Sequence, residues 1–372
     1  MATITWLGGT SWLDASAWDL KRTPMADDRV VIPDLPGDSP VTISSGNVSV
    51  NSIAAAETLR LTGGVLTVAT TIDAQAGLEL AGGTLAQATT SAATRIIAGN
   101  TGGRLSGVHV QGDLDVSRYG NANVTIYDGL ELNGLLLVGD AAGSTYGRIY
   151  FADGSNPAGS LTGSGTVVFG GSVYNFLSNQ SNIGGAGGAL TLGPSITVRG
   201  KNGTISNAYP NGSLVNQGLI RVDSAGGGLS IGGNGTTPFT NSGRIEVASG
   251  VLTLNGTTTL VGLGIIERTG GAINLGGTLD LQGATWTLDA TTGSWNLAGG
   301  AIRNGTLIEN DGSLLVITNQ GGTLDRMKVR GDLDASRFGN ANVTIYGGLE
   351  LNGSLLVGDA AGSTYGRIYF AD

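Results

Sequence analysis

The sequence predicts an all-β fold, a parallel β-helix (β-solenoid) with coils of about 20 residues and an N-terminal cap. Three observations predict this fold class. A stretch of 41 residues occurs twice, short segments carry apolar residues at alternate positions, and one turn signature recurs every 19 to 23 residues. Self-similarity of this kind is typical of architectures that stack one structural unit along an axis.

Residues 113–153 and 332–372 are nearly identical, with an offset of 332 − 113 = 219. Four of the 41 aligned positions differ: Val116/Ala335, Tyr119/Phe338, Asp128/Gly347 and Leu135/Ser354. Fainter similarity extends the two related units to about 77–153 and 294–372, with two residues gained in between. Loops absorb such insertions at lower cost than strands in register, so we interpret both units as parts of one solenoid over residues 51–372.

The repeat also bears on the extent of the protein. The second copy stops at Asp372, where the first continues with Gly154. We therefore expect the chain to be a segment of a longer array, and we expect a signal peptide to lie outside this segment.

Alternation with period two is typical of strands with one buried face. The clearest such segments are residues 59–61, 66–68, 78–80, 130–132, 252–254 and 279–281. Pairs such as Gly-Gly and Asn-Gly separate them and supply the positive φ that tight turns require. Two segments have weak helical character, residues 52–60 and 86–98, and we expect both to be irregular or loops.

A Gly-Gly-x-apolar signature decides between the all-β alternatives. It begins at Gly63, Gly82, Gly102, Gly276, Gly299 and Gly321. A sandwich or barrel does not normally repeat one turn at such spacing, whereas each coil of a solenoid has an equivalent turn. The spacing therefore favours a solenoid, in which each strand pairs with its equivalent one coil later.

Residues 1–50 differ from the rest of the chain. Trp6, Trp12 and Trp18 recur every six residues, and a Pro-rich stretch follows. We interpret this Trp/Pro-rich segment as a cap, because an open end of stacked strands exposes unpaired backbone and apolar core. The alternative is an aromatic platform for sugars, but buried aromatic residues usually serve packing.

Composition narrows the class of protein further. The chain has 66 Gly, no Cys and only 13% charged residues, yet Leu, Val and Ile are plentiful, which argues against plain disorder. No apolar run is long enough for a membrane helix. The net charge is −9, and the sequence has no cluster of basic residues of the kind that binds nucleic acid, so no nucleic-acid partner is expected.

Several segments resemble the "N-x-G-x-I … G-x-L-x-L" repeats of very large bacterial surface exoproteins. They are residues 214–220 (LVNQGLI), 241–247 (NSGRIEV) and 249–254 (SGVLTL). The opening, with Trp6, Trp12, Trp18, Pro24 and residues 27–32 (DDRVVI), resembles the start of such surface modules. Filamentous-haemagglutinin-like adhesins and autotransporter passengers belong to this group. The resemblance implies a parallel β-helix, export to the cell surface and adhesive or structural work, and it transfers no catalytic residues.

The best candidate for chemistry is Asp113, Asp115 and Arg118, which recur as Asp332, Asp334 and Arg337. The four aspartates could form a Ca²⁺ site or a sugar-cleaving site. We favour a third interpretation, a solvated face with a local ion pair, because an enzyme rarely needs its active site twice. His109 is the single imidazole, and a lone histidine is usually structural.

The sequence thus predicts a structural or adhesive segment of a long exported bacterial surface repeat protein, acting as a rigid spacer or cell-surface fibre. We expect no enzymatic activity, no cofactor and an extracellular location at the bacterial surface. The expected partners are cell-surface glycans or neighbouring copies of the protein, with no membrane span in this segment. The alternative is a carbohydrate-binding or polysaccharide-cleaving parallel β-helix protein.

Overall fold

Strands make up 53% of the computed structural model and helices 2%, and every described pairing between strands is parallel, which confirms the predicted parallel β-solenoid. The structure describes residues 1–37, 39–153, 159–181, 187–209, 211–233 and 237–372. The chain divides into two compact units, Met1–Val198 (unit 1) and Arg199–Asp372 (unit 2).

Unit 1 is built from three ladders of parallel strands, named here by an early strand. The β2 ladder contains β1 (Thr3–Thr5), β2 (Arg29–Ile32), β5 (Ser52–Ala55), β8 (Thr71–Ala74), β11 (Thr89–Thr90), β13 (Arg104–Val110), β15 (Ala122–Leu132), β18 (Gly159–Thr162) and β21 (Ala189–Leu192). The β4 ladder contains β4 (Asn47–Val50), β7 (Val65–Val68), β10 (Thr84–Ala86), the long strands β13 and β15, β17 (Gly147–Ala152) and β20 (Phe176–Asn179). The β3 ladder contains β3 (Val41–Ile43), β6 (Leu59–Leu61), β9 (Leu78–Leu80), β12 (Ile96–Ala98), β14 (Leu114–Val116), β16 (Leu135–Val138), β19 (Thr166–Phe169) and β22 (Thr197–Gly200), in which the chain passes into unit 2.

Unit 2 is also built from ladders of parallel strands, but its strands are arranged differently. The β23 ladder contains β23 (Asn202–Asn207), β26 (Gly228–Ile231), β29 (Val251–Leu254), β32 (Ala272–Leu275), β35 (Trp295–Leu297), β37 (Leu315–Ile317), β39 (Leu333–Ala335) and β41 (Leu355–Val357). The β25 ladder contains β25 (Leu219–Val222), β28 (Arg244–Val247) and β31 (Ile265–Arg268), and β24 (Ser213–Asn216) pairs with β27 (Phe239–Asn241). The β30 ladder contains β30 (Thr257–Thr259), β33 (Thr278–Asp280), β34 (Thr285–Leu288), β36 (Ala301–Glu309), β38 (Thr323–Arg330), β40 (Ala341–Asn352) and β42 (Gly366–Ala371).

Within the described residues, two short helices interrupt the strands. One is a 3₁₀ turn, η1 (Ala15–Ala17). The other is α1 (Leu260–Leu263), which begins after Thr259, whose hydroxyl accepts a hydrogen bond from Gly262 N, and ends at Gly264. Both are single turns, so neither alters the β-solenoid class.

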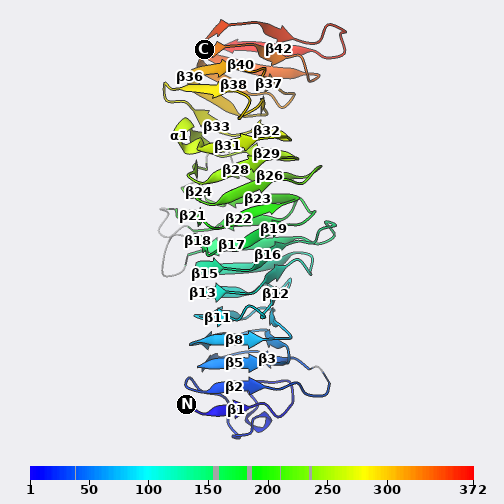
Figure 1. Cartoon of the computed structure of the whole chain (residues 1–372), viewed down its shortest axis with the longest axis vertical. Coiled ribbons are helices and arrows are strands. Elements are labelled where there is room, and N and C mark those ends of the chain that lie inside the picture. The colour runs from blue at the N-terminus through cyan, green and yellow to red at the C-terminus, as the bar shows by residue number, and fades with distance from the viewer. Residues whose placement is uncertain (38, 154–158, 182–186, 210, 234–236) are drawn as a thin grey trace. The chain divides into compact units, whose positions relative to one another are not determined.

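The core consists of like side chains stacked on one another between coils. In the β3 ladder, Leu59 pairs with Leu78 and Leu61 with Leu80, and all four side chains are fully buried. Figure 1 shows the strands β2, β5 and β8 of unit 1 lying one above another, which brings equivalent residues of successive coils together. Burial of one such side chain stabilises the fold by about 1.5–3 kcal/mol, so the inward positions are the main source of stability.

The number of residues per coil varies, whereas the sequence predicted about 20 residues for every coil. The offset between paired residues is 96 − 78 = 18 from β9 to β12 and 167 − 136 = 31 from β16 to β19. Part of the longer coil is a turn in which Asp140 and Thr145 bond to each other's backbone N–H groups. Insertions in turns leave the register of the ladders unchanged, whereas insertions within strands disturb it.

The predicted strands are found, and the prediction for two other segments is wrong. Residues 279–281 form a strand only as far as Asp280, as part of β33. Residues 52–60, expected to be irregular, contain β5 and the beginning of β6, and residues 86–98 contain β11 and β12. These strands have two to four residues, and each of them pairs with strands of neighbouring coils, which keeps it extended.

The Gly-Gly signature marks close approach between coils. A Cβ added to Gly103 would lie 2.6 Å from Leu80 Cβ, in the core of the preceding coil. In the second copy, a Cβ on Gly322 would lie 2.3 Å from Leu297 Cγ. The second glycine of the signature is therefore required by packing, since no side chain fits there.

Residues 1–50 contribute four strands, β1 to β4, which pair with one another or with later coils of unit 1. The segment is thus part of the ladders. Its role as a cap stays a prediction.

We expect Gly103→Ala to lower the free energy of unfolding by about 1–3 kcal/mol, because the methyl group overlaps Leu80 in a packed core. The matched control is Gly120→Ala, since a Cβ there meets nothing within 4 Å. Urea unfolding followed by circular dichroism measures both. Equal effects of the two substitutions would show that the signature does not serve packing.

Candidate functional site

The predicted Asp-x-Asp motif of the first copy forms a buried turn. Asp115 lies in β14 and is only 1% exposed. Its Oδ1 accepts hydrogen bonds from Ser117 N (3.0 Å) and Ser117 Oγ (2.5 Å). Its Oδ2 pairs with Arg118 Nε at 2.9 Å and with Arg95 Nη2 at 3.0 Å. The predicted ion pair is present, but the carboxylate of Asp115 is buried and not solvated as predicted, whereas its partner Arg118 is exposed.

The second copy keeps the turn and changes its surroundings. Asp334 is 3% exposed, accepts hydrogen bonds from Ser336 N and Oγ, and pairs with Arg337 Nε at 2.6 Å. The position equivalent to Arg95 is occupied by Leu314, by the offset 95 + 219 = 314. The second buried carboxylate therefore has one arginine partner where the first has two.

Both aspartates are held in the charged form. Burial by itself raises the pKa of Asp115, but hydrogen bonds from Ser117 and Arg118 and the charge of Arg95 outweigh it, so that the pKa is lowered. The pKa of Asp334 is lowered in the same way, by Ser336 and Arg337 against burial. These carboxylates therefore fasten turns, and their lone pairs are engaged within the protein.

The outer aspartate of each motif bonds to the next coil. Asp113 accepts a hydrogen bond from Leu135 N at 3.0 Å, and Asp332 accepts one from Ser354 N at 2.7 Å. Among the residues that the structure describes, no group of three or more His, Asp or Glu side chains is arranged to hold a metal ion. The four aspartates thus have hydrogen-bond partners within the protein.

Glu309 is a residue of this region that sequence reasoning missed. It ends β36, and its Oε1 and Oε2 accept hydrogen bonds from Leu315 N (2.6 Å) and Asp332 N (2.8 Å). The pKa of Glu309 is raised to about 7, chiefly by burial and also by the charges of Asp332 and Asp334, against the effect of the two N–H groups. No local sequence motif indicates this role of Glu309, because its hydrogen-bond partners come from later in the chain.

His109 lies on an exposed part of β13. Its Nδ1 contacts Glu131 Oε2 at 2.7 Å, one coil later. In the second copy Lys328 pairs with Glu350 at 3.1 Å. Both copies thus have a basic side chain in contact with an acidic one at this position, but only the first copy has an imidazole. This indicates that His109 serves to pair with Glu131.

The three N-terminal tryptophans pack against one another. The rings of Trp6 and Trp18 lie 4.8 Å apart, those of Trp12 and Trp18 5.0 Å apart, and both pairs are edge-to-face. Trp18 Nε1 donates to Trp12 O, and all three side chains are buried. The packing interpretation is confirmed, because the three rings contact one another in the interior and do not form an exposed aromatic platform.

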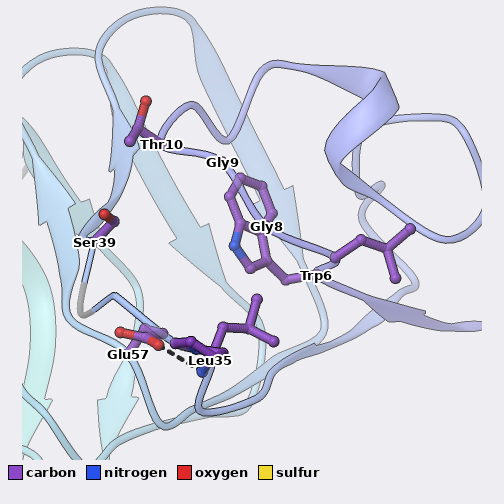
Figure 2. Close-up of a pocket in the computed structure, with 9 residues that line it drawn as sticks. Trp6, Gly8, Gly9, Thr10, Leu35, Ser39 and Glu57 are labelled. Carbon is purple, nitrogen blue, oxygen red and sulfur yellow. Dashed lines mark hydrogen bonds between the residues drawn. The ribbon is translucent and has the colours of Figure 1, made fainter.

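A pocket of about 440 Å³ lies beside Trp6. It is lined by Trp6, Leu7, Gly8, Gly9, Thr10, Leu35, Pro36, Ser39 and Glu57. Figure 2 shows the indole of Trp6 on one side of this hollow and the carboxylate of Glu57 on the other, hydrogen-bonded to Leu35.

Aromatic rings and an arginine form a second surface feature, here called the aromatic–arginine stripe: Tyr146, Arg148, Tyr150, Tyr174 and Phe176. Arg148 lies between two rings, with its Cζ 5.2 Å from the centroid of Tyr146 and 5.0 Å from that of Phe176. Tyr174 is 62% exposed, and its ring centroid lies 5.8 Å from that of Tyr146. The ring centroids of Tyr150 and Phe176 lie 6.1 Å apart. Such stacking fixes the rings and the guanidinium relative to one another.

The second copy repeats the core of this stripe. Tyr365, Arg367 and Tyr369 occupy the equivalent positions, and Arg367 Cζ lies 5.5 Å from the ring of Tyr365. Sequence reasoning missed the stripe, although a signal exists. In β17, Ile149 and Phe151 are buried, so period-two alternation places Arg148 and Tyr150 outward.

Comparison with models of known protein families, with curated proteins and with solved structures finds no match to this chain. In the part of the chain that the structure describes, neither helix is long and apolar enough to cross a membrane.

We expect the stability of the wild-type protein, relative to Glu309→Gln, to fall as the pH rises from about 4.5 to about 7. The folded-state pKa of Glu309 (about 7) lies above its ordinary value of 4.5. The folded state therefore holds a proton that the unfolded chain releases, and the stabilisation is full below 4.5 and lost through 7. Urea midpoints at several pH values measure the difference. Parallel pH profiles of the two proteins would contradict the assignment.

Proposed function

We propose that this chain is a structural and adhesive segment of a long exported bacterial surface repeat protein, in which the coils act as a rigid spacer or as part of a cell-surface fibre. The observation that supports this proposal best is the continuous register between coils. In unit 1, Leu114, Asp115 and Val116 face Leu136, Leu137 and Val138 of the next coil. Bending such a ladder requires the loss of backbone hydrogen bonds, which makes the stacked coils stiff.

Surface charges of unit 2 follow the same ladders. Glu246 pairs with Arg221 of the preceding coil at 2.7 Å and with Arg244 of its own strand at 3.1 Å, and Arg244 also pairs with Glu267 of the next coil. A single exposed ion pair contributes only about 0–1 kcal/mol. The row of charges therefore supplements the backbone ladder and does not replace it as the source of stiffness.

The proposed role is not enzymatic. The carboxylates of Asp113, Asp115, Asp332 and Asp334 all accept hydrogen bonds from the protein itself. A carboxylate that acts as acid, base or nucleophile needs access to substrate, and Asp115 and Asp334 are buried. These contacts support a scaffold in which the acidic residues close turns.

A second candidate function, carbohydrate binding, is favoured by the aromatic–arginine stripe. The C–H face of a sugar ring is apolar and its hydroxyl edge is polar, so an exposed ring beside a guanidinium suits both parts. Tyr174 offers such a ring, and Tyr365 and Tyr369 are also exposed in the second copy. Cell-surface glycans are therefore the partners that we propose for adhesion, with neighbouring copies of the protein as the alternative.

Stiffness is tested by pulsed electron spin resonance on spin labels at Ser45→Cys and Ala142→Cys, both at exposed turn positions of unit 1. The chain has no native cysteine, so labelling is specific. A rigid ladder should give one narrow distance distribution, no broader than the label linkers allow. A broad or bimodal distribution would argue against a spacer role for this unit.

Adhesion is tested on a glycan panel with the wild type and Tyr174→Ala. We expect binding without release of reducing ends, and at least about fivefold weaker binding of the variant, since truncating a central aromatic contact costs more than about 1 kcal/mol. Tyr119→Ala, another exposed tyrosine outside the stripe, is the matched control. Cleavage products that disappear in Asp113→Asn with Asp332→Asn would instead support the enzymatic alternative.

A further inference from the structure

The pocket beside Trp6 contains a buried carboxylate that has no cation. Glu57 follows β5 and is 6% exposed. Its Oε1 accepts a hydrogen bond from Leu35 N at 2.8 Å, and Figure 2 shows the second oxygen pointing away from Leu35. Glu57 forms no ion pair with any residue that the structure describes.

An unpaired buried carboxylate is costly, because the charge gives up water without gaining a counter-ion. The ion pairs of this protein show the usual solution, as where Arg22 pairs with the buried Asp28. At Glu57 no basic residue lines the pocket. The chain thus presents one negative charge to a hollow large enough for a small molecule, since binding pockets measure about 300–1,000 Å³.

The wall of the pocket opposite Glu57, which includes Trp6, also suits a positively charged ligand. Trp6 is held in place by its edge contact with Trp18. Gly8 and Gly9 keep the space open, with φ of +127° and +115°, and a Cβ on Gly9 would lie 3.7 Å from the ring of Trp6. An indole attracts a cation through its ring electrons, most strongly where water is excluded. Leu35 and Pro36 add apolar contacts for a carbon chain.

We propose that this pocket binds a small organic ammonium ion, with Glu57 as its counter-ion and Trp6 as its aromatic contact. The hydroxyl groups of Thr10 and Ser39 line the rim and can accept hydrogen bonds from a primary ammonium group. An anionic ligand is disfavoured by Glu57, and a neutral ligand leaves the carboxylate without a partner. The site is independent of the aromatic–arginine stripe and of the spacer role.

The test uses the full chain and two probes, n-butylammonium and choline, with n-butanol as the neutral isostere of the first. Binding is followed by nuclear magnetic resonance on the indole N–H signal of Trp6, assigned with Trp6→Phe, and by calorimetry. Both the signal shift and the heat should appear with an ammonium probe and not with n-butanol. Whichever ammonium probe binds more tightly identifies the headgroup within the proposed class.

Glu57→Gln is the decisive variant, because the amide oxygen still accepts the hydrogen bond from Leu35 while the charge is removed. We expect at least about tenfold weaker binding, equivalent to about 1.4 kcal/mol. Glu131→Gln removes a half-buried carboxylate elsewhere in unit 1 and should leave affinity unchanged. Equal binding of n-butylammonium and n-butanol by the wild type would overturn the proposal without any variant. Unchanged affinity in a folded Glu57→Gln protein would do so as well.

Discussion

Parallel backbone hydrogen bonding between successive coils is the interaction on which the rest of this structure depends. Each strand pairs with its equivalent one coil earlier and one coil later, as β9 does with β6 and β12. Because side chains alternate between the two faces of a strand, a shift of one residue would turn a whole apolar set outward. The inward Leu, Ile and Val positions and the second glycine of the signature are therefore fixed by the neighbouring coils.

Outward positions and turns carry no such constraint, and there the two copies differ. Arg95 corresponds to Leu314, and His109 corresponds to Lys328. The buried aspartate keeps its serine and following arginine in both copies, which indicates that the turn itself needs them. Near this aspartate in the second copy, burial and the charges of Asp332 and Asp334 raise the pKa of Glu309.

The aromatic–arginine stripe and the pocket beside Trp6 lie in different settings. The stripe lies on two strands and the turn residues before them, and its core recurs with the repeat, so any binding that this core provides multiplies with the number of copies. The pocket lies in residues 1–57, where the turns are long and irregular and the repeat pattern is weak. A scaffold of stacked coils thus offers repeated surfaces along its sides and single sites in its irregular segments.

The sequence by itself determined the fold class, most strand positions and the turn glycines, because alternation and turn chemistry are local properties. It did not determine the extended segments within residues 86–98, where pairing partners rather than the Thr- and Ala-rich sequence impose the strands. Nor did it determine the burial of Asp115 by Arg95, the surroundings of Glu309 or the position of Glu57 beside Leu35. Those contacts join residues about one coil apart, and coil length varies from 18 to 31 residues. Only the tertiary structure decided them, because stacking sets which turn residues meet, and spacing along the chain does not.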